Sequence, residues 1–192
     1  MKFRLLVFVL LFSSGLFGQH KIQTYASFAI DQKEVVWVQV YPQNDAQENL
    51  SGQVLDFLKR KSWIKNLQFD GQEIMADLEN FRVDYKRYGG KYMNTSMLIR
   101  SARWSGKIRV SFKDGKYRVI IYGLNYDARQ PSMSTGKMTQ LAHPIHGTWT
   151  DWVLNNYRSA FLTRRHKNLD LMHFSLKDSF TLSEIAFDNA DW

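Results

Sequence analysis

Residues 107–126 read KIRVSFKDGKYRVIIYGLNY and contain the clearest structural signal in the chain. Two runs in which apolar and polar residues alternate flank Asp114 and Gly115. An Asp-Gly pair between such runs favours a two-residue hairpin loop with a type I′ turn. The segment therefore predicts an antiparallel β-hairpin in which Lys113 faces Lys116.

This register assigns every side chain of the hairpin to one of two faces, because side chains alternate along a strand. One face is apolar and consists of three facing pairs: Phe112 with Tyr117, Val110 with Val119, and Ile108 with Ile121. The other face carries five cations: Lys107, Arg109, Lys113, Lys116 and Arg118. A two-stranded ribbon is marginally stable alone. Other parts of the chain must therefore cover the apolar face.

The composition is that of a globular protein with a packed core. The chain has 192 residues, of which 44% are hydrophobic and 15% aromatic, enough for one domain to fold without a disulfide or a metal. It has no cysteine, which excludes disulfides, thiolate metal sites and thiol nucleophiles.

The first eighteen residues, MKFRLLVFVLLFSSGLFG, have the pattern of a secretory signal peptide. Lys2 and Arg4 precede an apolar run and a stretch of small residues, and we expect cleavage on either side of Gln19. An uncleaved N-terminal anchor is the alternative, although the run is short for a membrane span. The protein is therefore expected to be exported and to be periplasmic or extracellular. No later segment is apolar enough to predict a transmembrane helix.

The remaining elements follow from local patterns. A strand is expected over 34–41, EVVWVQVY, and a helix over 46–61, where Asp45 and Glu48 resemble an N-terminal helix signal. Trp63 is expected to pack under the end of that helix. A strand over 73–85 changes phase near Glu79 and Asn80, which predicts a bulge.

Further along the chain, a strand is expected over 97–103 and a long loop over 127–147. Thr150 and Asp151 are expected to cap a second helix with Val153, Tyr157, Ala160 and Phe161 on one face; a strand is the alternative. Asn168 is expected to cap a third helix, whose apolar line is Leu169, Met172, Leu176 and Phe180.

Together these elements predict a single α+β domain over 19–192, in which an antiparallel sheet has helices packed on one face. Residues 34–127 would form the core sheet and first helix, 128–147 a loop, and 148–188 the C-terminal elements.

The order of these segments resembles that of a known family. The strand EVVWVQVY, a helix ending in LKRKSW, several strands and the hairpin RVSFKDGKYRVIIYGLNY are similar to a secreted Bacteroidota domain of unknown function with a TBP-like fold. The similarity covers residues 34–127, and the leader ending in FGQ is similar too. The resemblance implies a curved antiparallel sheet backed by helices. It implies no activity, and a shape does not transfer DNA binding.

Positive charge is concentrated around the hairpin. Residues 82–118 contain eleven Lys or Arg and only two Asp, and such a patch favours an anionic partner. The candidate binding residues are Arg100, Arg103, Lys107, Arg109, Lys113, Lys116 and Arg118, with Trp104 and Tyr122 as aromatic neighbours. The alternative is an ordinary solvated strand face. Because the leader predicts export, we expect an anionic envelope component or another envelope protein as the partner rather than nucleic acid.

Catalytic motifs give weaker signals. Residues 134–137, STGK, lack the first glycine and the final Ser or Thr of a phosphate-binding loop, and Ser62 with Lys65 lacks the companion elements of acylating serine enzymes. His143 and His146 form the best metal candidate, but a third ligand is needed, with Asp127, Asp151 or His166 as possible sources.

The sequence therefore predicts a non-enzymatic exported module without a cofactor. It would bind its partner through the cationic sheet face or the loop 127–147. A metal-assisted hydrolase at His143 and His146 is the alternative function, and two ordinary loop histidines are the alternative to a metal site.

Overall fold

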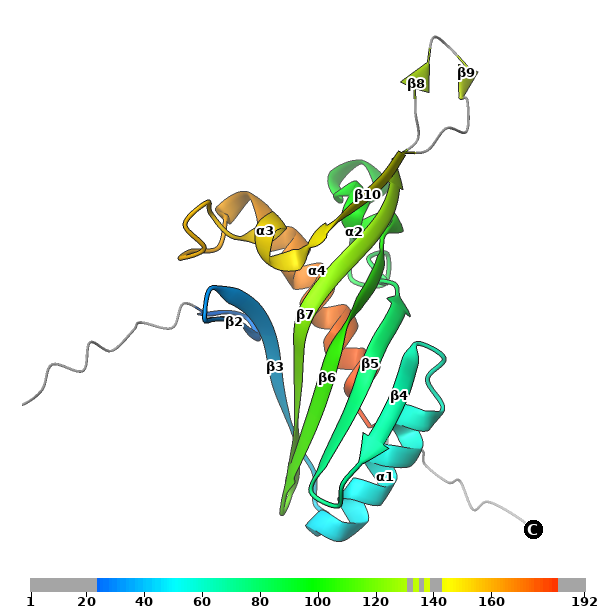
Figure 1. Ribbon diagram of the computed structural model, residues 1–192, viewed down its shortest axis with the longest axis vertical. Helices are drawn as coiled ribbons and strands as arrows, with labels where there is room; N and C mark the ends of the chain where they lie inside the picture. The colour runs from blue at the N-terminus through cyan, green and yellow to red at the C-terminus, as the bar shows by residue number, and fades with distance from the viewer. Residues whose placement is uncertain (1–23, 131–132, 135–136, 139–142, 183–192) are drawn as a thin grey trace, which may run out of the picture.

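The fold is built on an eight-stranded antiparallel sheet, as a computed structural model shows (Figure 1). The structure describes residues 24–130, 133–134, 137–138 and 143–182, with side chains described outside residues 129–144. The strands of the sheet are β1 Thr24–Tyr25, β2 Phe28–Asp31, β3 Glu34–Pro42, β4 Ile64–Phe69, β5 Glu73–Phe81, β6 Arg103–Lys113, β7 Lys116–Gln130 and β10 His143–Thr148. Their order is β1-β2-β3-β7-β6-β5-β4, and β10 also pairs with β7.

The helices are mostly short. They are α1 Gln47–Lys59, α2 Met97–Ser101, α3 Trp149–Val153 and α4 His166–Phe180, with 3₁₀ turns η1 Tyr92–Asn94 and η2 Thr163–Arg165. Strands β8 Met133–Ser134 and β9 Lys137–Met138 pair with each other apart from the main sheet. Among the described residues, no helix is long and apolar enough to cross a membrane.

The hairpin of β6 and β7 lies at the centre of the sheet and has the predicted register. Lys113 faces Lys116, Phe112 faces Tyr117, and the pairing continues without a shift to Lys107 and Tyr122. The turn itself differs from the prediction. Gly115 has a φ of 71°, but Asp114 is not among the residues with a positive φ, which a type I′ turn requires at both positions. The two-residue loop alone sets the register.

Hydrogen bonds from the preceding connection explain this turn geometry. The Gln43 amide donates to the Gly115 carbonyl at 2.8 Å, and the Gly115 amide donates to the Asp45 carbonyl at 3.1 Å. The Gln47 amide at the start of α1 donates to the Asp114 carboxylate at 3.2 Å. The N-cap residue of α1 is therefore Ala46, and the side chain that accepts from its first turn is Asp114 rather than the expected Asp45. The hairpin turn and the start of α1 form one bonded unit.

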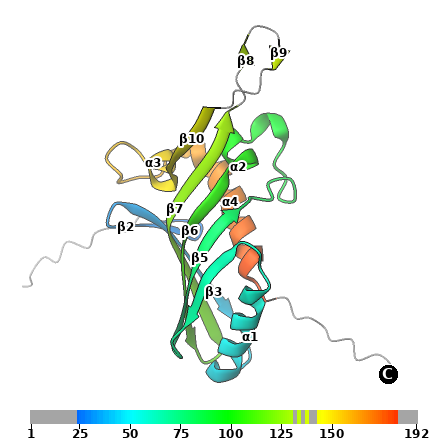
Figure 2. The ribbon, with the colours of Figure 1, turned by 45° about the vertical axis from the view of Figure 1, so that its right-hand side comes forward.

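The long strand β7 connects two halves of the sheet. Its first half pairs with β3 and its last half with β10, so that the sheet divides along β7. Helix α3 lies between these two branches, at the end of the sheet far from α1 (Figures 1 and 2). The Val35 amide of β3 donates to the Thr150 hydroxyl of α3 at 3.0 Å, which ties the branches together.

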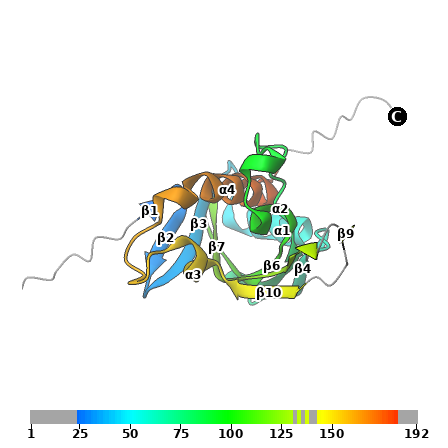
Figure 3. The ribbon, with the colours of Figure 1, turned by 90° about the horizontal axis from the view of Figure 1, so that it is seen from above.

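Helices α1, α2 and α4 cover one side of the curved sheet (Figure 3). Alternate residues of the strands point to this side and form one buried hydrophobic cluster, which includes Trp37, Ile108 and Val119. Helix α4 adds the predicted line Leu169, Met172, Leu176 and Phe180, all buried. The expected α+β class, a curved antiparallel sheet with helices packed on one face, is confirmed.

Strand β3, helix α1 and the start of strand β5 agree with the predictions, whereas strand β4 Ile64–Phe69 was not predicted. Strand β3, helix α1 and the bulge after Leu78 are present, and Asn80 has a φ of 57° at that bulge. Trp63 follows α1 and packs edge-on against Phe81 and Phe180, with ring centroids 5.3 and 5.4 Å apart. Strand β5 ends at Phe81, four residues before the predicted end.

Three predicted elements are wrong. Residues 97–101 form helix α2 instead of a strand, because the Ser96 hydroxyl caps it by accepting from the Leu98 amide. The loop 127–147 is strand at both ends, since β7 runs to Gln130 and β10 starts at His143. The second helix ends at Val153: a tight turn follows, in which Leu154 bridges to Phe161 and Tyr157 is exposed.

Helix α3 and helix α4 also begin earlier than expected. The cap of α3 is Thr148, whose hydroxyl accepts from the Asp151 amide at 3.0 Å. Asn168 lies inside the first turn of α4, and its side-chain oxygen accepts from the Ser96 amide at 3.3 Å instead of capping its own helix. The expected signal peptide, residues 1–18, and residues 183–188 of the C-terminal elements lie outside the described residues.

Candidate functional site

The five cations of the hairpin share one face of the sheet, as the register predicts. Each alternates with a buried residue and each is exposed, so that all five point away from α1, α2 and α4. They are Lys107, Arg109, Lys113, Lys116 and Arg118. Arg103, at the start of β6, is also exposed and lies on the same face, four residues before Lys107.

Acidic residues of the neighbouring strand β5 pair with two of these cations. The Lys107 ammonium lies 2.7 Å from the Asp77 carboxylate, and the Arg109 guanidinium lies 3.8 Å from Glu73. A hydrogen bond from Asn66 and the pair with Lys107 hold the pKa of Asp77 below its usual value. This part of the face is therefore a network of opposite charges.

The remaining three cations, Lys113, Lys116 and Arg118, form what we call the hairpin patch. Within the described part of the chain they take part in no ion pair and no side-chain hydrogen bond. Lys113 and Lys116 are directly opposite each other, and Arg118 is opposite Val40 of β3, which is 44% exposed. The patch combines uncompensated positive charge with accessible apolar surface.

Two residues of the predicted site lie elsewhere. Arg100 belongs to α2, where its guanidinium stacks on the Tyr92 ring at 3.8 Å. Arg100 does not lie on the sheet, because residues 97–101 form a helix instead of the expected strand. Trp104 is fully buried and packs edge-on against Trp149, with ring centroids 5.1 Å apart. Neither can contact a partner on the sheet face, whereas Tyr122 is half-buried on that face opposite Lys107.

The histidine pair is only partly described. His146 is exposed on β10, and its Nδ1 lies 3.5 Å from the Asp127 carboxylate, while the His143 side chain lies outside the described residues. Arg103 is opposite Asp127 in the sheet. Asp151 instead bonds to Arg158, and His166 stacks on Tyr25.

No cluster of three potential metal ligands occurs among the residues that the structure describes. The metal-assisted hydrolase stays a prediction. Metal analysis of protein purified without chelators, compared with the double variant His143→Ala and His146→Ala, would test it.

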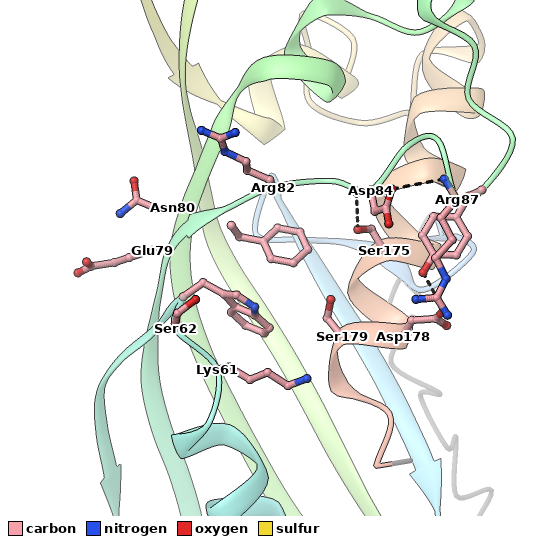
Figure 4. A pocket seen from close by; sticks show the side chains of 13 residues that line it. Lys61, Ser62, Glu79, Asn80, Arg82, Asp84, Arg87, Ser175, Asp178 and Ser179 are labelled. Carbon is pink, nitrogen blue, oxygen red and sulfur yellow. Dashed lines mark hydrogen bonds and ion pairs between the residues drawn. The ribbon is translucent and has the colours of Figure 1, made fainter. Parts of the chain in front are cut away.

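A groove of about 440 Å³ lies between the α1–β4 corner, the segment after β5 and helix α4 (Figure 4). Its lining residues are Lys61, Ser62, Trp63, Glu79, Asn80, Phe81, Arg82, Asp84, Arg87, Tyr88, Ser175, Asp178 and Ser179. The volume is in the range of small-molecule sites.

An ion pair lies at one end of this groove. Arg87 lies 3.2 Å from the Asp178 carboxylate, which also accepts a 2.7 Å hydrogen bond from the Tyr88 hydroxyl. Burial and this hydrogen bond raise the pKa of Tyr88 to about 12. The Asp84 amide donates to the Ser175 hydroxyl at 3.0 Å and joins the segment after β5 to α4.

Sequence reasoning did not find the groove. Its residues come from three segments, the first and last of which are more than a hundred positions apart, and none belongs to a recognised motif. The signals that pointed toward it were the packing of Trp63 under a helix end and the bulge at Glu79 and Asn80.

No family model matches the chain, and no curated protein matches it. Two solved structures are similar in shape. A TBP-like protein from Parabacteroides distasonis is 10% identical with a TM-score of 0.46, and the match covers 78% of this chain and 90% of that one. A DUF4468 family protein from Bacteroides ovatus is 13% identical with a TM-score of 0.45, covering 81% and 91%.

These structures agree with the resemblance noted from the sequence, a Bacteroidota domain of unknown function. They indicate no enzyme family. Similarity at this level concerns shape and extends to no ligand or partner.

Proposed function

We propose that the protein is a non-enzymatic binding module of the cell envelope that holds an anionic envelope component against its hairpin patch. One observation supports the proposal. Three exposed cations on adjacent strands have no acidic partner among the described residues, although two cations on the same face are paired with β5. An anionic partner would supply the missing counter-charge.

The placement of Lys113 opposite Lys116 supports the same proposal. Like charges directly opposite in an antiparallel pair destabilise the pairing of the two strands. A bound phosphate, sulfate or carboxylate group would relieve this repulsion. Val40 and the aliphatic part of Arg118 offer apolar contacts to the same ligand.

The envelope location rests on the leader-like residues 1–18. Purification of the protein from the envelope fraction of an expressing Gram-negative host, followed by N-terminal sequencing, tests it. We expect a mature N-terminus at Gln19 or His20. A chain that still begins at Met1 and remains in the cytoplasm would contradict export.

Binding is tested with dextran sulfate as the polyanion and neutral dextran as its control. The variant carries Lys113→Glu, Lys116→Glu and Arg118→Glu. The matched control carries Lys86→Glu, Lys91→Glu and Lys167→Glu, three exposed lysines outside the sheet. We expect the first variant to bind dextran sulfate at least about tenfold more weakly, and the control variant to lose much less.

Salt is the second variable of this experiment. Binding to the hairpin patch should weaken as ionic strength rises, because screening acts strongly on exposed charges. Equal losses in both triple variants would mean that only net charge matters, and the hairpin patch would then be solvated surface.

A further inference from the structure

We infer that the groove beside α4 binds a small carboxylic acid with an aromatic or aliphatic body. This site is separate from the hairpin patch, because the groove opens at the α1–β4 corner and the patch lies on the outer sheet face. The inference is independent of the proposed envelope function.

Lys61 is the group that selects an anion. It lies at the end of α1, half-buried, and its side chain extends across one end of the groove below Ser179 (Figure 4). Its ammonium lies 4.2 Å from the centre of the Phe57 ring and forms no ion pair with a described acidic residue. Burial and the neighbouring Arg60 lower the pKa of Lys61, so that an anion would stabilise its charged form.

The acidic residues of the rim do not supply this counter-charge. Asp178 is engaged by Arg87 and Tyr88. The Asp84 carboxylate accepts from the Arg87 amide at 3.4 Å, and the Glu79 side chain points away from the groove (Figure 4). The positive charge of Lys61 is therefore not balanced by these acidic residues and is available to an anionic ligand.

Hydroxyl groups and aromatic rings complete the site. Ser62 and Ser179 line the groove and make no side-chain hydrogen bond among the described residues, so that their hydroxyls are free to donate to a carboxylate. Trp63 and Phe81 form an apolar wall with ring centroids 5.3 Å apart. A carboxylate near Lys61 with its apolar body against Trp63 satisfies both parts of the groove.

At the opposite end Arg87 is paired with Asp178, and Arg82 and Asp84 line the groove with opposite charges. These charges offset one another, so that Lys61 sets the charge of the ligand. A carboxylate carries one negative charge, and one ammonium can balance it. A phosphate monoester carries nearly two, which favours a carboxylic acid as the ligand class.

The test compares phenylacetate with phenylacetamide, which has the same shape but no charge. Both are titrated into the full chain at millimolar concentration and followed by NMR through the indole N–H of Trp63. We expect saturable shifts with phenylacetate and binding at least about tenfold weaker with phenylacetamide.

Variants locate the effect. Lys61→Gln should remove the preference for phenylacetate, whereas Lys59→Gln should keep it, because Lys59 is an exposed neighbour paired with Asp56. Lys61→Arg should retain part of the binding, and thermal unfolding checks that each variant is folded.

Three results would overturn the inference. They are no saturable shift of Trp63 with phenylacetate, equal binding of the two probes, or equal effects of Lys61→Gln and Lys59→Gln. The triple hairpin-patch variant separates the two proposals. It should bind phenylacetate as the wild type does, whether or not the wild type binds dextran sulfate.

Discussion

A buried hydrogen bond between Trp37 and His173 should make the fold sensitive to mild acid. The Trp37 Nε1 donates to His173 Nδ1 at 3.2 Å, with Trp37 fully buried and His173 9% exposed. Since Nδ1 accepts this bond, the imidazole is neutral. Burial, together with the positive charge of Lys177, lowers the pKa of His173 below its ordinary value of 6.5, while Asp170 acts in the opposite direction.

The sign of the effect follows from proton linkage. With the folded pKa lowered, the unfolded state binds more protons below about pH 6.5, and stability falls as the pH falls. If His173 stayed neutral throughout, the free energy of unfolding would drop by about 1.4 kcal/mol between about pH 7.5 and pH 5.5. This is the upper limit for one histidine.

Urea unfolding at these two pH values measures the effect. The wild-type chain should lose stability, by at most about 1.4 kcal/mol, and His173→Gln, which keeps an acceptor for Trp37 but does not titrate, should lose much less. His146→Gln is the control for the loss of a histidine elsewhere in the chain, on the exposed strand β10. Equal losses in the wild type and His173→Gln would refute the reasoning.

Two further predictions concern local packing and capping. Gly147→Ala should destabilise the chain by about 1–3 kcal/mol, because a Cβ there would collide with the Tyr126 ring. Gly52→Ala should instead stabilise it by up to about 1 kcal/mol, because this helical position has open space around it. Thermal unfolding distinguishes the two signs, and equal shifts of the unfolding temperature would contradict this packing. Asp114→Ala should cost about 1 kcal/mol in urea unfolding, because its carboxylate accepts from the Gln47 amide at the start of α1; an unchanged midpoint would show that this cap contributes nothing.

The hairpin was predictable because its determinants are local. Alternation assigns faces, and a two-residue loop leaves only one register in which Lys113 meets Lys116. The backbone of Asp114 was not predictable, since its conformation depends on bonds from Gln43 and Gln47. Strand β3 and helix α4 were equally clear from their apolar patterns.

Helix α2 and strand β10 show where local patterns fail. Five residues are too few for a helical period, and α2 is stabilised by its Ser96 cap and by contact with α4. Strand β10 has little alternation, and its place comes from pairing with the end of β7. Arg100 was predicted to lie on the sheet because the short helix α2 could not be recognised from the sequence.

The candidate sites were predictable to different degrees. The cations of β6 and β7 followed from alternation, but their pairing with Asp77 and Glu73 depends on which strand lies beside β6. The groove joins Lys61 to α4 and depends wholly on tertiary structure.

Binding of dextran sulfate to the single variant Lys116→Glu tests the central claim most directly. A glutamate opposite Lys113 replaces a repulsive pair with an attractive one. We therefore predict a chain that is more stable by a few tenths of a kcal/mol and yet binds the polyanion several-fold more weakly. A variant that is more stable and binds as tightly as the wild type would contradict a role for the hairpin patch in binding.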